Sequence, residues 1–169
     1  MINLVLSNNN DKPINDEQLK KAVKDSLKEK INSLKKVLII PPDFTRFHSQ
    51  AGKITAMYWD ILKDRCEIDI LPALGTHEPM SEEECLEMFG PYVPYSKIIN
   101  HNWKTDVVKI GEVPKEYVSE ISEGLVNNLI EVEVNKLLID DSYDLILSIG
   151  QVVPHEVVGM ANYSKNIFY

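Results

Sequence analysis

The sequence has few cysteines, and this scarcity excludes a disulfide-rich extracellular scaffold. Only Cys66 and Cys85 occur among 169 residues, and their spacing suits neither a disulfide framework nor a zinc site. The segment Met1–Asn10 has no basic region, and its apolar run is too short for a secretory signal. No apolar stretch approaches the length needed to cross a bilayer. We therefore expect a cytoplasmic protein with no membrane partner.

Positive charge is also scarce, which argues against a nucleic-acid partner. The 18 Lys and Arg are outnumbered by 26 Asp and Glu, giving a net charge of −8, whereas a nucleic-acid surface needs clustered cations. The Gly-x-Gly-x-x-Gly and Walker-type loops are absent, so a doubly wound domain for some other nucleotide lacks support. Because repeats and Gly/Ser linkers are missing too, we expect one domain over residues 1–169.

The sequence contains an alternation of apolar and amphipathic segments. Strands are expected at 2–7, 37–40, 68–74, 97–101, 106–113, 130–134 and 144–150. Helices are expected at 16–34, 54–65, 81–89, 114–125 and 135–142, with Asp16 as the first N-cap and a capping box of Ser81 and Glu84 in the third. Apolar strands separated by amphipathic helices predict an α/β fold, a Rossmann-like layered domain with a mostly parallel sheet.

Polar residues follow the strand expected at 37–40. In parallel sheets, ligands bind beyond the carboxyl ends of the strands, and this strand leads to Asp43, Thr45 and Arg46. The arginine can hold a carboxylate or phosphate through two parallel hydrogen bonds. The alternative is a helix cap made by the Asp and Thr, with Arg46 in solvent.

Histidines follow other expected strands. The 68–74 strand leads to His77, the 97–101 segment ends at His101, and the 144–150 strand leads to His155 and later Lys165. An imidazole transfers protons near neutral pH, although a lone histidine is commonly structural, and His101 equally suits a strand face. Because several strand ends present titratable groups, we expect His77 and His155 to face one shared cleft with Arg46 at its rim.

Taken in order, these motifs resemble one known family. They are Asp43-x-Thr45-Arg46, Leu74-Gly75-Thr76-His77-x-Pro79-Met80, Asn100-His101, and Gly150-x-x-x-Pro154-His155 with Gly159 and Lys165. Their order and spacing resemble the N-terminal domain of the nickel-pincer-dependent lactate racemase family. The resemblance runs from Asp43 to the last residue and identifies the chain as a lactate-racemase-like N-terminal domain.

The resemblance implies a hydride-transfer isomerase acting on a 2-hydroxy acid. It implies that His77 and His155 are the catalytic acid and base, that Lys165, Asp43 and Thr45 bind the cofactor, and that Arg46 and His101 bind the substrate. Members of the family carry a nickel-pincer nucleotide, tethered through the lysine that matches Lys165. Imidazole is a suitable base near pH 7, and the hydride step belongs to the cofactor.

Two departures from the family pattern limit what is expected of this chain. Ala161-Asn162-Tyr163-Ser164 replaces a Ser-Gly-Gly-Arg run, and Glu78 stands where a basic residue is common, which makes lactate itself a poor candidate substrate. The chain stops at Tyr169, whereas the family continues into further sequence that supplies a histidine ligand to nickel. We therefore expect the isolated chain to hold no cofactor and to be inactive. The alternative function is a cofactor-less domain that binds a small anion or hydroxy acid.

Overall fold

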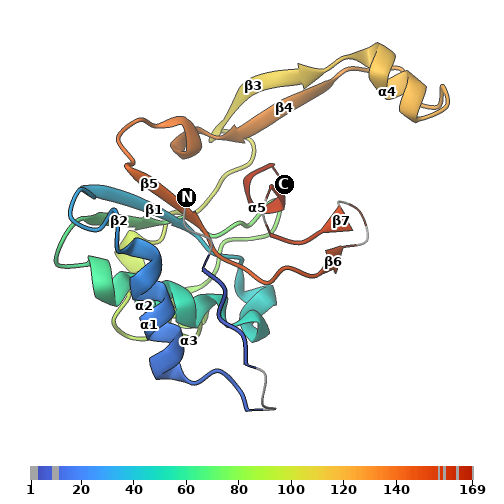
Figure 1. The fold of residues 1–169 in the computed structure, drawn as a ribbon. Coiled ribbons are helices and arrows are strands. Elements are labelled where there is room, and N and C mark those ends of the chain that lie inside the picture. Colours follow the sequence, from blue (N-terminus) through green and yellow to red (C-terminus); the bar gives the residue numbers. More distant parts are fainter. Residues whose placement is uncertain (1–3, 9–11, 156, 158, 163, 169) are drawn as a thin grey trace.

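A three-stranded parallel sheet forms the centre of the fold (Figure 1). The structure is a computed structural model that describes residues 4–8, 12–155, 157, 159–162 and 164–168. Strand β1 (Lys36–Ile40) lies between β2 (Glu67–Ile70) and β5 (Leu145–Ser148) and runs parallel to both. The predicted α/β class and parallel sheet are confirmed.

Strand β1 is buried on both of its faces. Val37, Leu38 and Ile39 have no exposed surface and Ile40 has only 1%, so each contributes roughly 1.5–3 kcal/mol through burial. Because successive side chains of a strand point to opposite faces, Val37 and Ile39 join one hydrophobic cluster while Leu38 and Ile40 join another. The continuous apolar run is thus explained by two covered faces.

Three helices pack on the Val37 and Ile39 face of the sheet (Figure 1). They are α1 (Asp16–Leu27), α2 (Ala51–Leu62) and α3 (Glu82–Phe89). Helix α3 begins with the predicted capping box of Ser81 and Glu84. In chain order α2 lies between β1 and β2. It is therefore the crossover helix that joins these two parallel strands.

The first helix begins at Asp16 as predicted, but its predicted N-cap and its predicted end at residue 34 are wrong. The N-cap is Asn15, whose side chain accepts the Gln18 N–H while the Gln18 side chain accepts the Asn15 N–H. Asp16 already lies in the first turn, where its charge favours the helix dipole. The helix stops at Leu27, because tighter turns follow it and bring Leu34 into the core.

The opposite face of the sheet is covered by a shorter segment. A single 3-10 turn, η3 (Lys136–Ile139), replaces the helix predicted at 135–142. Asn135 begins the turn by accepting the Leu137 N–H. Leu137, Leu138 and Tyr143 pack against the second hydrophobic cluster, so one turn is enough to cover this face.

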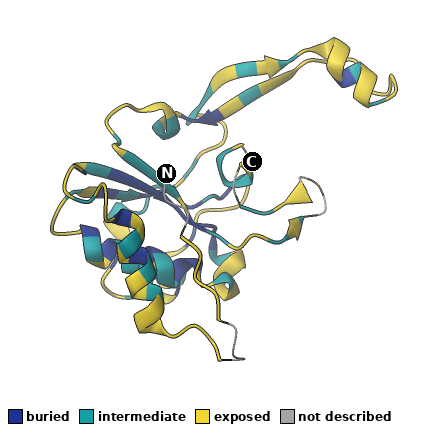
Figure 2. Cartoon of the chain, in the orientation of Figure 1, coloured by how far each residue is buried: buried dark blue, intermediate teal, exposed yellow. Residues whose placement is uncertain are grey.

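An antiparallel arm projects from the body of the domain (Figure 1). It consists of β3 (Val107–Val113) and β4 (Ile130–Asn135), with α4 (Lys115–Ile121) between them at the tip. Most of its surface is exposed (Figure 2). The strands and helix predicted here are confirmed, but they form a ribbon separate from the parallel sheet.

Two predicted strands are wrong. At 97–101 the chain forms a 3-10 turn, η2 (Tyr95–Lys97), after Pro94, and in this segment only Ile98 makes an isolated bridge, with Ile70. In the segment predicted at 2–7, the described residues 4–7 are exposed and have no regular structure. Residues 2 and 3 lie outside the described part of the chain. Apolar sequence without a partner strand does not make a strand.

The remaining elements gather at the carboxyl edge of the parallel sheet (Figure 1). They are the 3-10 segment η1 (Phe44–Ser49), the short strands β6 (Pro154–His155) and β7 (Gly159–Met160), and α5 (Lys165–Phe168). Because β1, β2 and β5 are parallel, the segments that follow them leave the sheet at the same edge. In the described part of the chain, no helix combines the length and apolar character that a membrane span requires.

Candidate functional site

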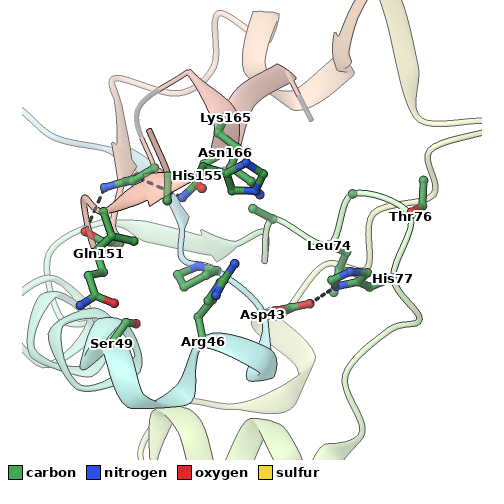
Figure 3. A pocket seen from close by; sticks show the side chains of 17 residues that line it. Asp43, Arg46, Ser49, Leu74, Thr76, His77, Gln151, His155, Lys165 and Asn166 are labelled. Carbon is green, nitrogen blue, oxygen red and sulfur yellow. Dashed lines mark hydrogen bonds and ion pairs between the residues drawn. The ribbon is translucent and has the colours of Figure 1, made fainter. Parts of the chain in front are cut away.

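A cavity of about 250 Å³ lies beyond the carboxyl ends of β1, β2 and β5 (Figure 3). The segments that follow these three strands form its wall, together with the turn that leads into α5. Its polar and charged wall residues are Asp43, Arg46, Ser49, Thr76, His77, Gln151, His155, Asn162, Lys165 and Asn166. Pockets for drug-sized ligands measure roughly 300–1,000 Å³, so this cavity suits a smaller molecule.

Asp43 is a buried carboxylate that organises one side of the cavity. It ends the segment after β1 and caps η1, where its Oδ1 accepts the Thr45 N–H and hydroxyl. Its Oδ2 is hydrogen bonded to Nδ1 of His77 (Figure 3). The Asp43 side chain is 8% exposed and the His77 side chain 61%. A fixed carboxylate therefore holds an imidazole that is open to the cavity.

This hydrogen bond sets the protonation pattern of the His77 ring. An ionised carboxylate can only accept hydrogen bonds, so Nδ1 of His77 carries the shared proton. In the neutral ring Nε2 is then unprotonated and can accept a proton. The arrangement is that of a carboxylate that orients a histidine base.

His155 has the opposite pattern. It lies in β6 opposite Gly159 of β7, and its Nδ1 accepts the Val157 N–H at 3.1 Å. In the neutral ring the proton is therefore on Nε2, which can donate it. Both histidines line the same cavity, so one proton-accepting and one proton-donating imidazole face the same space.

Two cations also line the cavity, Arg46 from η1 and Lys165 at the start of α5. Arg46 reaches toward the cavity from the side of Asp43, and Lys165 lies on the side of His155 (Figure 3). Positive groups from two segments favour an anionic ligand, and a guanidinium can bind a carboxylate with two hydrogen bonds.

Two predicted site residues lie outside this cavity. Thr45 contacts Asp43 and lines a neighbouring crevice with Glu78 and Glu84. His101 lines a second cavity of about 400 Å³, which shares only the 73–76 wall and Asn166 with the first. The cofactor role of Thr45 and the substrate role of His101 stay predictions.

His101 is held in its neutral form. The Asn135 Oδ1 accepts the Leu137 N–H, which turns the amide nitrogen toward His101, and Nδ2 donates to Nδ1 of the ring at 2.9 Å. Burial lowers the pKa of His101, against the opposing charge of Asp106. The second cavity therefore contains an uncharged imidazole.

Sequence reasoning missed two residues of the first cavity, Ser49 and Asn166. Ser49 lies three residues after Arg46 in the same 3-10 segment, and Asn166 directly follows Lys165. Their positions beside predicted site residues were the available signal. Tyr163, singled out from the sequence, lies outside the described residues. No group of three or more His, Cys, Asp or Glu in the described part of the chain could hold a metal ion.

Comparison with known proteins gives one family. The family described as "Lactate racemase N-terminal domain" matches residues 3–169. No curated protein matches the chain.

Two solved structures resemble this one. The first, a protein from Thermotoga maritima, is 28% identical with a TM-score of 0.70, over 83% of this chain and 34% of that chain. The second, the lactate racemase apoprotein from Thermoanaerobacterium thermosaccharolyticum, is 23% identical with a TM-score of 0.63, over 88% of this chain and 36% of that chain. At this identity the second likeness shows the fold alone. The chain spans about a third of the length of both.

Proposed function

Because the chain belongs to the lactate racemase N-terminal domain family, we propose that it forms part of an enzyme that racemises or epimerises a 2-hydroxy acid. The observation that supports this most is that His77 and His155 line one small cavity with Arg46. The hydroxyl group of a 2-hydroxy acid must lose and regain its proton while the α-hydride leaves and returns, and imidazoles that line the cavity can accept and donate at that oxygen.

The hydrogen bonds of the two rings suggest how they divide this work. With Nδ1 protonated against Asp43, His77 takes the hydroxyl proton of the substrate on its Nε2. His155 donates a hydrogen bond from its Nε2–H to the same oxygen, and the proton held on Nε2 of His77 returns to that oxygen when the α-hydride comes back. Loss of the hydroxyl proton and of the α-hydride leaves a 2-keto acid, and the reverse transfers restore the hydroxy acid on either face. Asp43 stabilises the imidazolium that forms on His77.

Arg46 holds the substrate carboxylate in this proposal. Its position in the cavity wall, near the Asp43–His77 pair, lets one end of a small hydroxy acid bind the guanidinium while the hydroxyl meets an imidazole (Figure 3). Glu78 lines the crevice beside His77 and adds negative charge there. We therefore propose a hydroxy acid other than lactate as the substrate.

One residue of the cavity, Lys165, fits the attachment of a nucleotide cofactor. Lys165 lines the cavity that contains both histidines, so its Nζ would hold a nickel-pincer nucleotide at that cavity. When bound, that group would accept and return the α-hydride. Asp43 and Thr45 are the other predicted contacts of the cofactor.

A cofactor-less binding domain is the second candidate. The sequence has Tyr163 before Lys165, where the resemblance implies a small, basic run, and this favours a site that has lost the nucleotide. The cavity would then bind a small carboxylate through Arg46 and Lys165 without converting it.

We also propose a cytoplasmic location. Cys66 and Cys85 are both free thiols, and burial raises the pKa of Cys85 to about 11. A buried thiol with a high pKa is chemically inert and packs as a small apolar residue, which suits a reducing compartment.

The test of the proposed function uses the whole enzyme of which this chain forms part, co-expressed with the enzymes that make the nickel-pincer nucleotide. Intact-mass measurement reports an adduct on Lys165, and chiral chromatography follows both enantiomers of a panel of 2-hydroxy acids. We expect an adduct and interconversion of at least one acid, both lost in Lys165→Ala and retained in Lys115→Ala on the arm. An unmodified Lys165 with binding of the acids but no turnover would favour the second candidate.

A further inference from the structure

The hairpin that carries His155 is closed at its base by one side chain, that of Asn162. The chain leaves β5 at Gly150, forms β6 and β7, and returns at Asn162. There the Asn162 Nδ2 donates to the Gly150 carbonyl at 3.0 Å, and its Oδ1 accepts the Ser148 hydroxyl at 2.9 Å. Both ends of the hairpin are thus fixed to the carboxyl end of β5.

The same residue also fixes the turn that follows. The Asn162 Oδ1 accepts Nδ2 of Asn166 at 3.1 Å, and the Asn162 carbonyl accepts the Lys165 N–H at 3.1 Å. Asn166 and Lys165 both line the cavity. One residue therefore connects the end of a sheet strand to the His155 segment before it and to the Lys165 segment after it.

The backbone is built to accept this side chain. Asn162 has φ 63°, in the left-handed region that glycine and asparagine tolerate best. Gly150 lies so close that an added Cβ would approach the Asn162 Cγ to 3.1 Å. The glycine leaves room for the amide, and the amide occupies that room with hydrogen bonds.

We propose that Asn162 is a positioning residue, which holds His155 and Lys165 at the cavity by closing the base of the segment between them. The roles of His155 and Lys165 in this statement rest on the proposed function, whereas the closure itself does not. The side-chain hydrogen bonds of Asn162 order a turn that the backbone alone would leave looser.

The test measures local order and lysine reactivity in the full chain of Asn162→Gly. Glycine adopts φ 63° without strain, so this change removes the amide alone. Loss of its hydrogen bonds should speed amide exchange at Ala161 and Lys165 by roughly 10- to 100-fold, since each bond contributes about a factor of ten. Acylation of Lys165 by acetic anhydride should also become faster relative to Lys115.

A matched control removes a similar amide elsewhere. Asn127 donates its Nδ2 to the Gly124 carbonyl at 3.0 Å on the arm, so Asn127→Gly should leave exchange and acylation at Lys165 unchanged. Ser148→Ala removes one partner and should give a smaller effect of the same sign as Asn162→Gly. A melting temperature close to wild type in both Ser148→Ala and Asn162→Gly would show that the effect is local.

The outcomes separate this inference from the proposed function. Exchange and Lys165 acylation that match wild type in Asn162→Gly would overturn the positioning role, whatever the protein catalyses. Faster exchange in Asn162→Gly would support the closure role even if the protein converts no hydroxy acid, because neither measurement needs cofactor or substrate. In protein that carries the cofactor, Asn162→Gly should lower the fraction of modified Lys165, and an unchanged fraction would confine the role to local order and overturn its link to the cofactor.

Discussion

Asp43 and His77 are hydrogen bonded through Oδ2 and Nδ1, although they follow two different strands and lie 34 residues apart. The contact exists because β1 and β2 are adjacent and parallel, so that their carboxyl ends deliver both side chains to one place. The carboxylate is buried and the imidazole is open to the cavity. This pair is the most defined piece of acid–base geometry in the site.

Asp43→Asn should lower turnover of the full enzyme by roughly 100- to 10,000-fold, as expected when a general base is misplaced or in the wrong tautomer. The amide keeps an oxygen for the Thr45 N–H, so η1 should still form. It can no longer orient the Nδ1 proton of His77 as the carboxylate does. The measurement is kcat with thermal unfolding in parallel, and turnover close to wild type would exclude the dyad.

His77→Ala and His155→Ala should each abolish interconversion of the enantiomers while the melting temperature stays close to wild type. Neither side chain is part of the hydrophobic core, so truncation removes little packing. His48→Ala is the control, because His48 is an exposed residue of η1 and does not line the cavity. Chiral chromatography of the products checks the result, and retained racemisation in either variant would contradict it.

The parts of the fold that local pattern encodes could be predicted from the sequence. The run Val37–Ile40 is apolar at every position and β-branched at three of four, which favours a strand covered on both faces, and it forms β1. His77 and His155 were found because each follows an apolar strand. Their meeting in one cavity depends on the strand order β2-β1-β5, which the parallel-strand rule anticipates in general.

The parts that tertiary partners decide could not be predicted. The pair Ile98 and Ile99 is also consistent with a strand, but Pro94 starts a turn just before it and Ile98 makes only one bridge. His101 lies away from the other histidines because Asn135, at the base of the arm, holds it. The positioning role of Asn162 could not be predicted from its residue type, because its hydrogen bonds depend on where β5 ends.

Gly52→Ala should destabilise the fold by about 1–3 kcal/mol, the usual cost of overpacking a core. A Cβ at this position in α2 would lie 2.2 Å from the Met88 carbonyl oxygen of α3, and backbone cannot move aside cheaply. Gly111→Ala is the matched control, because it has open space around it in β3. Urea unfolding measures both, and equal free energies of unfolding would disprove the close approach of the two helices.

Asp144 should make stability fall in acid. The backbone N–H groups of Lys35 and Lys36 both donate to its Oδ2 and lower the pKa of this carboxyl. A group with a lowered folded pKa stabilises above its unfolded value near 3.9, and this contribution is lost as the pH falls through the folded value. Asp144→Asn should therefore be less sensitive to pH below about 5. Urea titrations between pH 3 and pH 7 compare the two proteins, and parallel curves would rule out this carboxylate as a cause.

His101 should lower the free energy of unfolding in mildly acidic solution. Burial lowers the pKa of the folded imidazole, while the unfolded one titrates near 6.5. As the pH falls below about 6.5, the unfolded state takes up a proton that the folded state refuses, so the free energy of unfolding decreases until the folded pKa is reached. His101→Gln cannot titrate and should lose less stability than wild type between pH 7 and pH 5.

Nuclear magnetic resonance of the His101 ring should give a pKa below 6.5 in the full chain, and Asn135→Leu, which removes the donor to Nδ1, should raise it. A ring that titrates at or above 6.5 would mean that neither burial nor the Asn135 amide keeps His101 neutral.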